Sequence, residues 1–413
     1  MNKKYLLKGL ITILIILFVS TLLYLYTAGY RLRKDEKSQV DIKVTGMISA
    51  KSLPEGASVY LDEELVTATN DSIPGVIPGK HLLEIKKNGF TPWQKEIEVF
   101  SELVTDITAV LISKTPRIEP LTNTGAKKPV MSPSLSAIAY LSMDDETPGV
   151  WVIPLNYNRI NFFSSTPKVI LEDTRYVKFS ESLDIKWSPD EKKLLVQQAE
   201  NAYYMADLVS DSAKSVSVAD VDEILAEWAE IVAENRKDLI EKSGLTGADG
   251  LTEELKEIAL DPETSWAPDE NKFLYKDKVI NNQGLIEYKI YNMEKPLPIG
   301  ETRGSVVLTT NPNDVQPKLS WYADSFHLVM VDNPLDEGVD DATQVNNGNS
   351  GENGEPSSSA IFLIRIDGTN KTGIYNNTIY SNRVFSSPGG DKIVLLTSFK
   401  SEAETNLYTV SIR

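Results

Sequence analysis

A short motif that recurs five times within residues 116–413 places the strongest constraint on how this chain can fold. Each copy is an apolar, aromatic or small residue, then Ser-Pro-Asp or a related triplet, then an apolar strand-like segment. The copies are Met131-Ser132-Pro133-Ser134, Trp187-Ser188-Pro189-Asp190, Trp266-Ala267-Pro268-Asp269, Trp321-Tyr322-Ala323-Asp324 and Ser386-Ser387-Pro388-Gly389-Gly390-Asp391. Recurrence of one unit indicates an array of similar supersecondary structures. We therefore expect a mainly β architecture built from repeats.

The chemistry of the triplet suits a tight turn between two strands. Proline presets φ, and the Asp side chain accepts hydrogen bonds from the following amides, so we expect these Asp residues to be structural. We expect the preceding Trp to fill space between neighbouring units. The unit resembles the WD40-like repeat of TolB-type proteins, with Trp187 to Asp190 the best match, which implies a C-terminal β-propeller over residues 116–413. Residues 305–309 and 168–171 also read as strands, so a degenerate sixth copy is possible and about 5–7 blades are expected.

The spacing of the motifs indicates insertions. The triplets begin at Ser132, Ser188, Ala267, Tyr322 and Ser387, which lie 56, 79, 55 and 65 residues apart, against about 40–45 for a usual blade. Residues 219–260 carry apolar side chains at helical spacing and predict a helical insertion, with Trp228 on its apolar face. We expect this face to pack on the propeller; a partner-binding role is the alternative. Residues 336–359 hold too little apolar surface to order themselves, so they predict a disordered loop.

The N-terminal segment is apolar. Residues 9–29 carry no charge, a length of about 20 residues that predicts a transmembrane helix; residues 1–37 would then form a cytoplasmic tail, the anchor and a linker. A cleaved signal peptide is the alternative, but the apolar run exceeds the usual length of about 7–15 residues. Basic residues flank both sides, so charge alone leaves the orientation open.

Residues 45–112 alternate short strand-like runs with turn residues, as in a small β-sandwich. Three landmarks follow one another: Pro54-Glu55-Gly56-Ala57, then Pro78-Gly79-Lys80-His81, then Gly89-Phe90-Thr91-Pro92-Trp93. In this order they closely resemble the PEGA domain family. The resemblance implies an extracytoplasmic β-sandwich that associates with the cell surface or wall, carries no catalytic residues, and places the bulk of the chain outside the cytoplasm.

The composition of the chain excludes several classes of partner and of catalytic or metal-binding site. The 42 basic and 59 acidic residues give a formal net charge of −17, which disfavours a nucleic-acid partner. The chain has no cysteine and two histidines, His81 and His327, both expected to be structural. We find no nucleophile elbow, zincin motif, P-loop or dinucleotide-binding loop, so we predict no catalytic, cofactor-binding or metal-ligating residue, and the binding residues stay unknown. Asp144-Asp145-Glu146 and residues 336–341 offer calcium ligands, but we expect solvated loops.

The sequence thus favours a non-enzymatic, single-pass membrane protein without a cofactor. Its PEGA-like domain would associate with the surface or wall, and its propeller would bind a protein or cell-envelope polymer. Two alternatives stay open. One is a propeller hydrolase or lyase that uses carboxylates and calcium at the central channel. The other is an accessory or sensory subunit coupled to a membrane complex through the helix.

Overall fold

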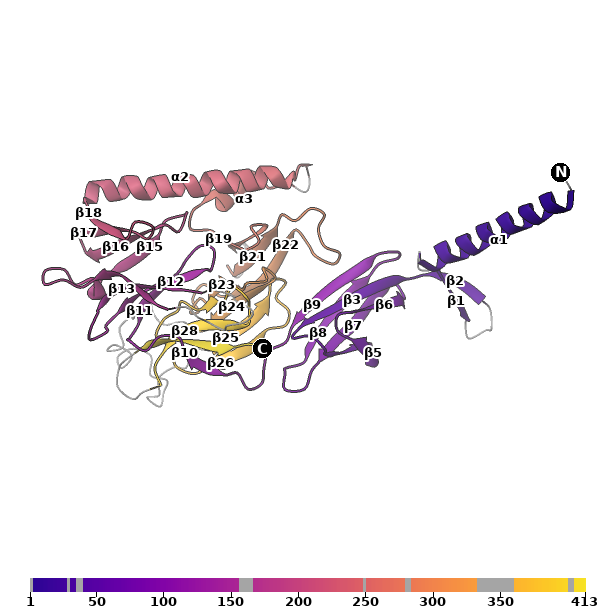
Figure 1. Cartoon of the computed structure of the whole chain (residues 1–413), viewed down its shortest axis with the longest axis horizontal. Coiled ribbons are helices and arrows are strands. Elements are labelled where there is room, and N and C mark those ends of the chain that lie inside the picture. Colours follow the sequence, from indigo (N-terminus) through magenta and orange to yellow (C-terminus); the bar gives the residue numbers. More distant parts are fainter. Residues whose placement is uncertain are drawn as a thin grey trace. The chain divides into compact units, whose positions relative to one another are not determined.

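The computed structural model describes residues 3–27, 30–34, 40–155, 166–247, 250–278, 284–332, 360–399 and 405–413 (Figure 1). The chain divides into two compact units, mainly residues 1–111 and mainly residues 112–413, and each is described by itself. The loop predicted to be disordered, residues 336–359, lies outside the described residues, and so does the acidic segment 336–341.

The first unit begins with helix α1, Lys3–Thr27, and the antiparallel strand pair β1, Tyr30–Lys34, and β2, Val40–Val44. The prediction of a transmembrane helix is corrected here. Among the helices in the described part of the chain, none is both long enough and apolar enough to span a bilayer.

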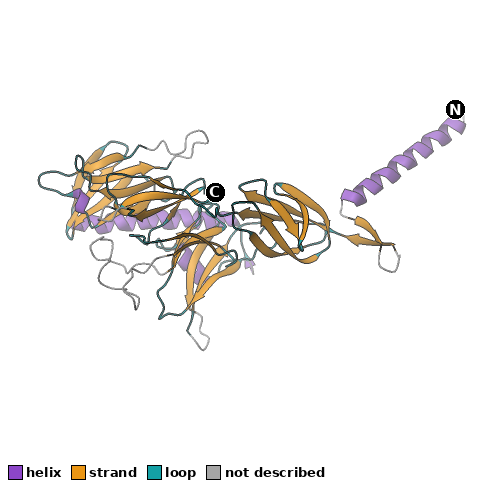
Figure 2. Cartoon of the chain, turned by 90° about the horizontal axis from the view of Figure 1, so that it is seen from below, coloured by secondary structure: helices purple, strands orange, loops and turns teal. Residues whose placement is uncertain are grey.

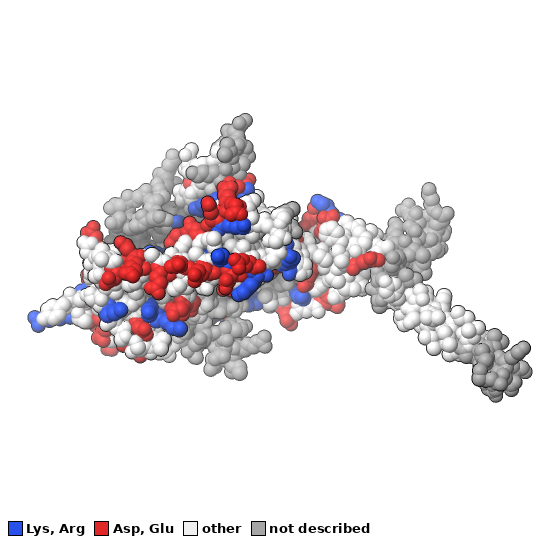
Figure 3. Space-filling model, turned by 90° about the horizontal axis from the view of Figure 1, so that it is seen from above, with Lys and Arg blue, Asp and Glu red and all other residues white. Residues whose placement is uncertain are grey.

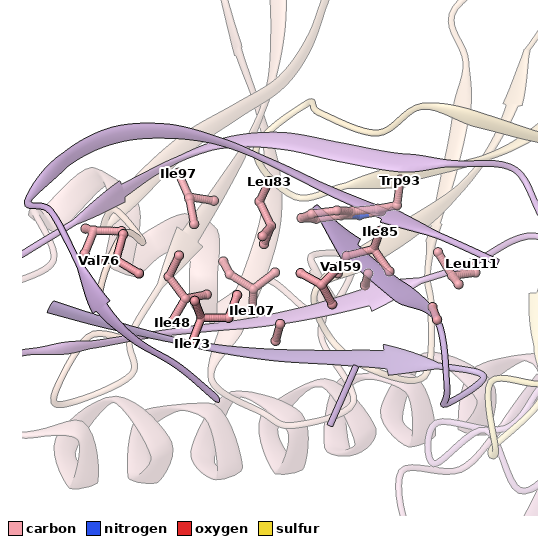
Figure 4. Packing of buried hydrophobic residues seen from close by; sticks show 14 residues of the cluster. Ile48, Val59, Ile73, Val76, Leu83, Ile85, Trp93, Ile97, Ile107 and Leu111 are labelled. Carbon is pink, nitrogen blue, oxygen red and sulfur yellow. The ribbon is translucent and has the colours of Figure 1, made fainter. Parts of the chain in front are cut away.

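A sandwich of two sheets follows. One sheet has the order β6-β3-β9, in which β3 pairs with β6 antiparallel and with β9 parallel; the other has the order β5-β4-β7-β8. The strands are β3, Gly46–Leu53; β4, Ser58–Leu61; β5, Glu64–Ala68; β6, Asp71–Val76; β7, Gly79–Lys86; β8, Trp93–Val99; and β9, Val104–Val110. Alternate residues of both sheets, among them Ile48, Val59, Leu83 and Ile107, point inward and form the core (Figure 4). This alternation is the pattern of a sandwich with two solvent-facing outer surfaces.

The second unit contains five four-stranded antiparallel sheets in its described residues, here called blades 1 to 5. Blade 1 is β11, Lys127–Met131; β12, Ala137–Ser142; β13, Gly149–Pro154; and β14, Lys168–Glu172. Blade 2 is β15, Asp184–Trp187; β16, Lys193–Ala199; β17, Ala202–Asp207; and β18, Ser212–Val216, and a short 3-10 helix, η1, Phe179–Glu181, precedes it. Blade 3 is β19, Ser265–Trp266; β20, Lys272–Lys278; β21, Ile286–Asn292; and β22, Gly304–Thr310. Blade 4 is β23, Lys318–Trp321; β24, His327–Asp332; β25, Ala360–Arg365; and β26, Thr372–Asn376.

Blade 5 closes the ring. Its strands are β27, Phe385–Ser386; β28, Lys392–Thr397; β29, Asn406–Ser411; and, from the start of the unit, β10, Ile118–Pro120, which pairs antiparallel with β29. Successive meanders closed by strands from both ends of the unit are the topology of a β-propeller. Residues 168–171 and 305–309 belong to β14 and β22, the outer strands of blades 1 and 3, so they do not form a sixth blade.

Two helices stand between blades 2 and 3, where the sequence predicted a helical insertion. Helix α2, Val218–Ser243, begins at Ser217, whose side chain accepts from the Asp220 amide, and ends at Gly244 with φ 60°. Helix α3, Glu253–Leu260, begins at Thr252, whose side chain accepts from the Leu255 amide. Figure 2 shows α2 as a long helix beside the strands of the second unit.

The apolar cores show how the blades meet. Leu141 and Val150 of blade 1 pack with Ile185 and Leu194 of blade 2. Blades 3 and 4 share a core, and so do blades 5 and 1. The facing surfaces of blades 2 and 3 are instead covered by the insertion. One cluster joins blade 2 to α2: Leu195, Met205 and Val216 of the blade with Val221, Ile224, Leu225 and Trp228 of the helix. A second cluster joins blade 3 to both helices: Phe273, Tyr291 and Met293 of the blade with Leu255, Ile258 and Ala259 of α3 and Ile240 of α2. The insertion therefore acts as a wedge in the ring.

Candidate functional site

The candidate site is a cavity of about 700 Å³ at the centre of the propeller, where the five inner strands meet. Every blade contributes to its lining, and one side is formed by the middle of α2. Its lining includes Met131–Leu135, Pro189, Glu191, Ser265–Pro268, Glu270, Leu319–Trp321 and Phe385–Ser386 from the blades, and Val232, Asn235, Arg236 and Leu239 from α2. Cavities at the centre of a ring of blades are common places for propellers to bind partners.

The repeated triplets form the turns that surround this cavity. In blade 2, Ser188 Oγ donates to Asp190 Oδ1 at 2.7 Å and accepts from the Lys193 amide at 2.9 Å. Blade 5 repeats both bonds, from Ser387 to Asp391 and from the Lys392 amide to Ser387. The residue that reverses each turn is left-handed, with φ between 57° and 61° at Leu135, Glu191, Glu270, Ser325 and Gly390. The Asp carboxylates of these turns therefore satisfy local amides and hydroxyls, which is the structural role that their position predicts.

Tryptophans of the inner strands connect neighbouring elements through their indole N–H groups. Trp187 donates to the Val130 carbonyl of blade 1 at 3.0 Å, and Trp321 donates to the Ser265 carbonyl of blade 3 at 3.1 Å. Trp266 of blade 3 instead donates to the Ala259 carbonyl of α3 at 2.9 Å. The wedge thus takes the place that a neighbouring blade occupies elsewhere in the ring.

Two charged side chains that line the cavity are engaged in holding it together. Glu191 of blade 2 accepts from the hydroxyls of Ser134, at 2.8 Å, and Ser136, at 3.0 Å, in the turn of blade 1. Arg236 of α2 reaches into the loop before blade 3, where it donates to the carbonyls of Asp261, Pro262 and Thr264.

The environment of Arg236 is partly apolar. Its guanidinium carbon lies 5.6 Å from the ring centre of Trp266, within the range of a cation–π interaction. Burial lowers the pKa of Arg236 to about 10, and the charges of Asp261 and Glu263 only partly oppose this effect. The guanidinium is therefore a structural link between α2 and blade 3.

Neither histidine lines the cavity. His327, with 2% of its surface exposed, places Nδ1 2.7 Å from Asp324 Oδ2 within its own turn. Burial raises the pKa of Asp324. The His327 imidazole and the hydrogen bonds from the amides of Phe326 and His327 lower it by more, so the pKa of Asp324 lies below its usual value. This pair belongs to the turn of blade 4.

His81 fixes two turns of the sandwich. Its Nδ1 lies 2.6 Å from Asp62 Oδ2 and its Nε2 lies 2.7 Å from the Ile77 carbonyl. Burial lowers the pKa of His81, but the hydrogen bonds to Asp62 and Ile77 and the charge of Asp62 outweigh it, and the pKa lies above its usual value. The hydrogen bond with His81 also lowers the pKa of Asp62. Since both ring nitrogens face acceptors, the arrangement suits the protonated imidazole.

The acidic segment at Asp144 is a turn between β12 and β13. Asp144 Oδ2 accepts from the Thr147 hydroxyl at 2.9 Å, and the side chains of Asp145 and Glu146 are exposed. Within the described ranges, no three or more His, Asp or Glu side chains gather as a metal-binding group. The structure therefore gives this segment a local role in its own turn.

A second hollow, of about 460 Å³, lies on the outer face of the β6-β3-β9 sheet. Ser49 and Lys51 of β3, Ser72 of β6 and Thr108 of β9 line it. Pairing places Ser49 opposite Ser72, and Lys51 opposite Thr108, so hydroxyls and a cation stand side by side on a sheet surface. Such a face can form several hydrogen bonds with a polar ligand.

Comparison with known families agrees with the landmarks of the sandwich. The model of the family described as PEGA domain matches residues 45–114. Residues 45–114 form a PEGA domain. The predicted combination of a PEGA domain with a C-terminal β-propeller is confirmed. A search of curated protein sequences gives no significant match.

Solved structures similar to this chain include TolB from Acinetobacter baumannii, with 15% identity, a TM-score of 0.27, and coverage of 81% of this chain and 60% of that one. They also include a TolB-like protein from Agrobacterium tumefaciens (12% identity, TM-score 0.23, coverage 87% and 99%) and an oligogalacturonate lyase from Vibrio parahaemolyticus (10% identity, TM-score 0.31, coverage 73% and 95%). The chain thus spans 60% of the length of the Acinetobacter TolB structure. The four-stranded antiparallel sheets in succession, with β10 paired to β29, identify the second unit as a propeller.

The sequence did not single out the residues that hold the cavity together. Arg236 is a charged residue among apolar ones, since Val232 and Leu239 lie on the same face of α2. A basic residue on an apolar helix face was therefore the available signal. Glu191 carried no such signal, because its partners in blade 1 lie 55 and 57 residues away in sequence.

Proposed function

We propose that this chain is a non-enzymatic binding and scaffolding protein that works outside the cytoplasm, with the propeller as the partner-binding unit and the PEGA domain as the unit that associates with a surface or wall polymer. A binding or scaffolding role fits the two domain types. The observation that carries the proposal is the central cavity. Its Glu191 and Arg236 are engaged in structural hydrogen bonds, so the site offers shape and apolar surface to a partner.

The polar hollow of the PEGA domain supports the second half of the proposal. Its hydroxyls and Lys51 occupy one sheet face, and a repetitive glycan or glycopeptide polymer presents matching donors and acceptors. Lys51 pairs across the sheet with Asp106 at 3.1 Å, which leaves both charges at the surface. A polymer partner gains affinity when several such faces bind one strand.

Co-sedimentation with purified cell-wall sacculi tests this function. The full chain is compared with a variant lacking residues 45–112 and with the double variant Ser49→Ala, Thr108→Ala; Gln94→Ala, on the other sheet, is the matched control. We expect the full chain and the control to sediment with the sacculi, and the other two to stay in solution. Equal sedimentation of all four proteins would refute wall association by the PEGA domain.

A further inference from the structure

A groove of about 600 Å³ runs between α2 and the face of blade 2, next to the central cavity, and Pro189 lines both. The helix packs on blade 2 through Val221 and Leu225 and then leaves the sheet on its way to blade 3, where Ile240 packs. The groove forms where the two separate. The wedge and the repeat turn of blade 2 therefore form the groove together.

Apolar side chains form the floor of the groove and its helical wall. Met205 of β17 lies at the floor, and Ile224, Trp228 and Ile231 of α2 form the wall. Trp228 is partly buried against blade 2, and Ile231 keeps 39% of its surface exposed. An indole ring beside an exposed aliphatic side chain offers a place for an apolar residue of a partner.

Carboxylates surround this apolar wall. Asp190 and Asp207 lie at the blade side, and Glu227 lies on the helix. The hydrogen bond from Ser188 lowers the pKa of Asp190, and hydrogen bonds from Ser210 and Val209 lower that of Asp207, so both are ionised at neutral pH. Lys193 and Lys214 also line the groove, which leaves one net negative charge among these five groups.

The negative charge continues along α2 beyond the groove. Exposed acids recur every three or four residues and so share one helix face: Asp220, Glu223, Glu227, Glu230, Glu234, Asp238 and Glu241. Figure 3 shows them as a band of acidic side chains over the helix. Within the described ranges, none of these carboxylates lies within 4 Å of a basic group. Like charges at this spacing destabilise a helix, so folding does not account for the band.

We propose that the groove binds a segment of a partner protein in which Lys or Arg residues are interspersed with apolar ones. The apolar residues contact Met205, Trp228 and Ile231, while the basic residues meet Glu227 and the acids farther along α2. An arginine of the segment can also stack on the Trp228 ring. This inference rests on the proposed function in one respect only: the propeller is the unit that binds the partner.

Fluorescence anisotropy with the full chain tests the proposal. The probes are three labelled peptides of equal length, made of Leu and Lys, of Leu and Glu, and of Ser and Lys. We expect the Leu–Lys peptide to bind most tightly, because it alone satisfies both the apolar wall and the acids. Tighter or equal binding of either other peptide would overturn the proposal.

Substitutions on α2 and in blade 2 distinguish binding in the groove from non-specific electrostatic attraction of the peptide to the acidic helix. Glu227→Lys and Ile231→Ser are expected to weaken binding of the Leu–Lys peptide about tenfold, and Glu241→Lys, the same charge change far from the groove, less than about twofold. Lys214→Glu is expected to tighten binding about threefold, a gain that misfolding cannot produce. Equal weakening by Glu227→Lys and Glu241→Lys, or no gain with Lys214→Glu, would overturn the groove as the site. The sacculus experiment uses the PEGA domain, so its failure is distinguishable from these outcomes.

Discussion

Blades 1 and 2 meet sheet against sheet, whereas blades 2 and 3 meet through two helices. The first seam is held by one apolar core, by the Trp187 indole and by Glu191 between the two turns. The second consists of two separate cores, one on each blade, joined along α2 and by Arg236. Related copies of the repeat motif lie on both sides of each seam, so the insertion is what distinguishes the second seam from the first. The comparison shows that an inserted segment can join two blades in place of direct contact between their sheets. The same segment then stabilises the ring and provides exposed side chains that can bind a partner.

The strongest test of this comparison removes the wedge. Replacing residues 218–260 by a short Gly-Ser linker uncovers Leu195, Met205, Phe273 and Tyr291, all buried. Each loses burial worth about 1.5–3 kcal/mol, so we expect the propeller to lose cooperative unfolding and to bind a hydrophobic dye. Replacing residues 336–359 in the same way is the control and is expected to leave unfolding unchanged. If the shortened propeller melts as cooperatively as the full chain, blades 2 and 3 can meet directly and the wedge is dispensable.

Matched cavities in the two seams sharpen the comparison. Phe273→Ala, at a fully buried site of blade 3, is expected to cost about 3–5 kcal/mol, and Leu194→Ala, equally buried between blades 1 and 2, about 2–5 kcal/mol. Urea unfolding gives these free energies. Hydrogen exchange then locates the loss: Phe273→Ala should speed exchange in α2 and α3 and spare blade 1, and Leu194→Ala should do the reverse. The same exchange pattern in both variants would mean that the two seams are not independent.

Arg236 offers a smaller and more local change. Arg236→Met keeps the packing volume but leaves the carbonyls of Asp261 and Thr264 without this donor, and we expect a loss of about 1–3 kcal/mol. Arg236→Lys should recover little of it, because an ammonium cannot reproduce the fork of donors over Trp266. Both losses are read by urea unfolding. A full rescue by lysine would show that charge alone joins the helix to blade 3.

The smallest expected effect is a pH-dependent shift in the thermal stability of the PEGA domain. This shift also identifies which thermal transition belongs to the PEGA domain and which to the propeller. The folded-state pKa of His81 lies above 6.5, so its contribution to the stability of the PEGA domain is present below pH 6.5 and is lost as the pH rises through the raised pKa. The contribution of Asp62 to the stability of the PEGA domain has the opposite pH dependence. Because the pKa of Asp62 is lowered, this contribution is lost as the pH falls through that pKa. In calorimetry between pH 6 and 8, the PEGA transition should move to lower temperature, and His81→Gln should abolish the shift. A shift that persists in His81→Gln would assign the pH dependence to another group.

Local chemistry explains what the sequence could predict. Triplets such as Ser188-Pro189-Asp190 specify their own turn, and landmarks such as Gly56, with φ 73°, require a left-handed backbone, so both were readable without tertiary information. The helical insertion was readable from its periodicity. The prediction of a transmembrane helix was wrong, because no described helix has the length and hydropathy needed to cross a membrane.

Tertiary partners explain what the sequence could not predict. The periodicity of α2 shows that it has an apolar face, but not that Val221 packs on blade 2 and Ile240 on blade 3. The same limit applies to the candidate site. Trp228 was recognised as an apolar-face residue, whereas its place beside a groove depends on where the helix leaves the sheet. Arg236 and Glu191 bind partners that no local pattern brings near them.

The pairing of β10 with β29 has a consequence for how this protein is made. Glu119 and Thr409 are neighbours in the folded ring but lie 290 residues apart in the chain. While a ribosome is still translating the intervening blades, β10 has no partner and blade 5 does not exist, so the growing propeller exposes apolar faces that chaperones must shield. A chain released before Asn406 keeps those faces open permanently. An unclosed ring therefore offers proteases more exposed chain than a closed one.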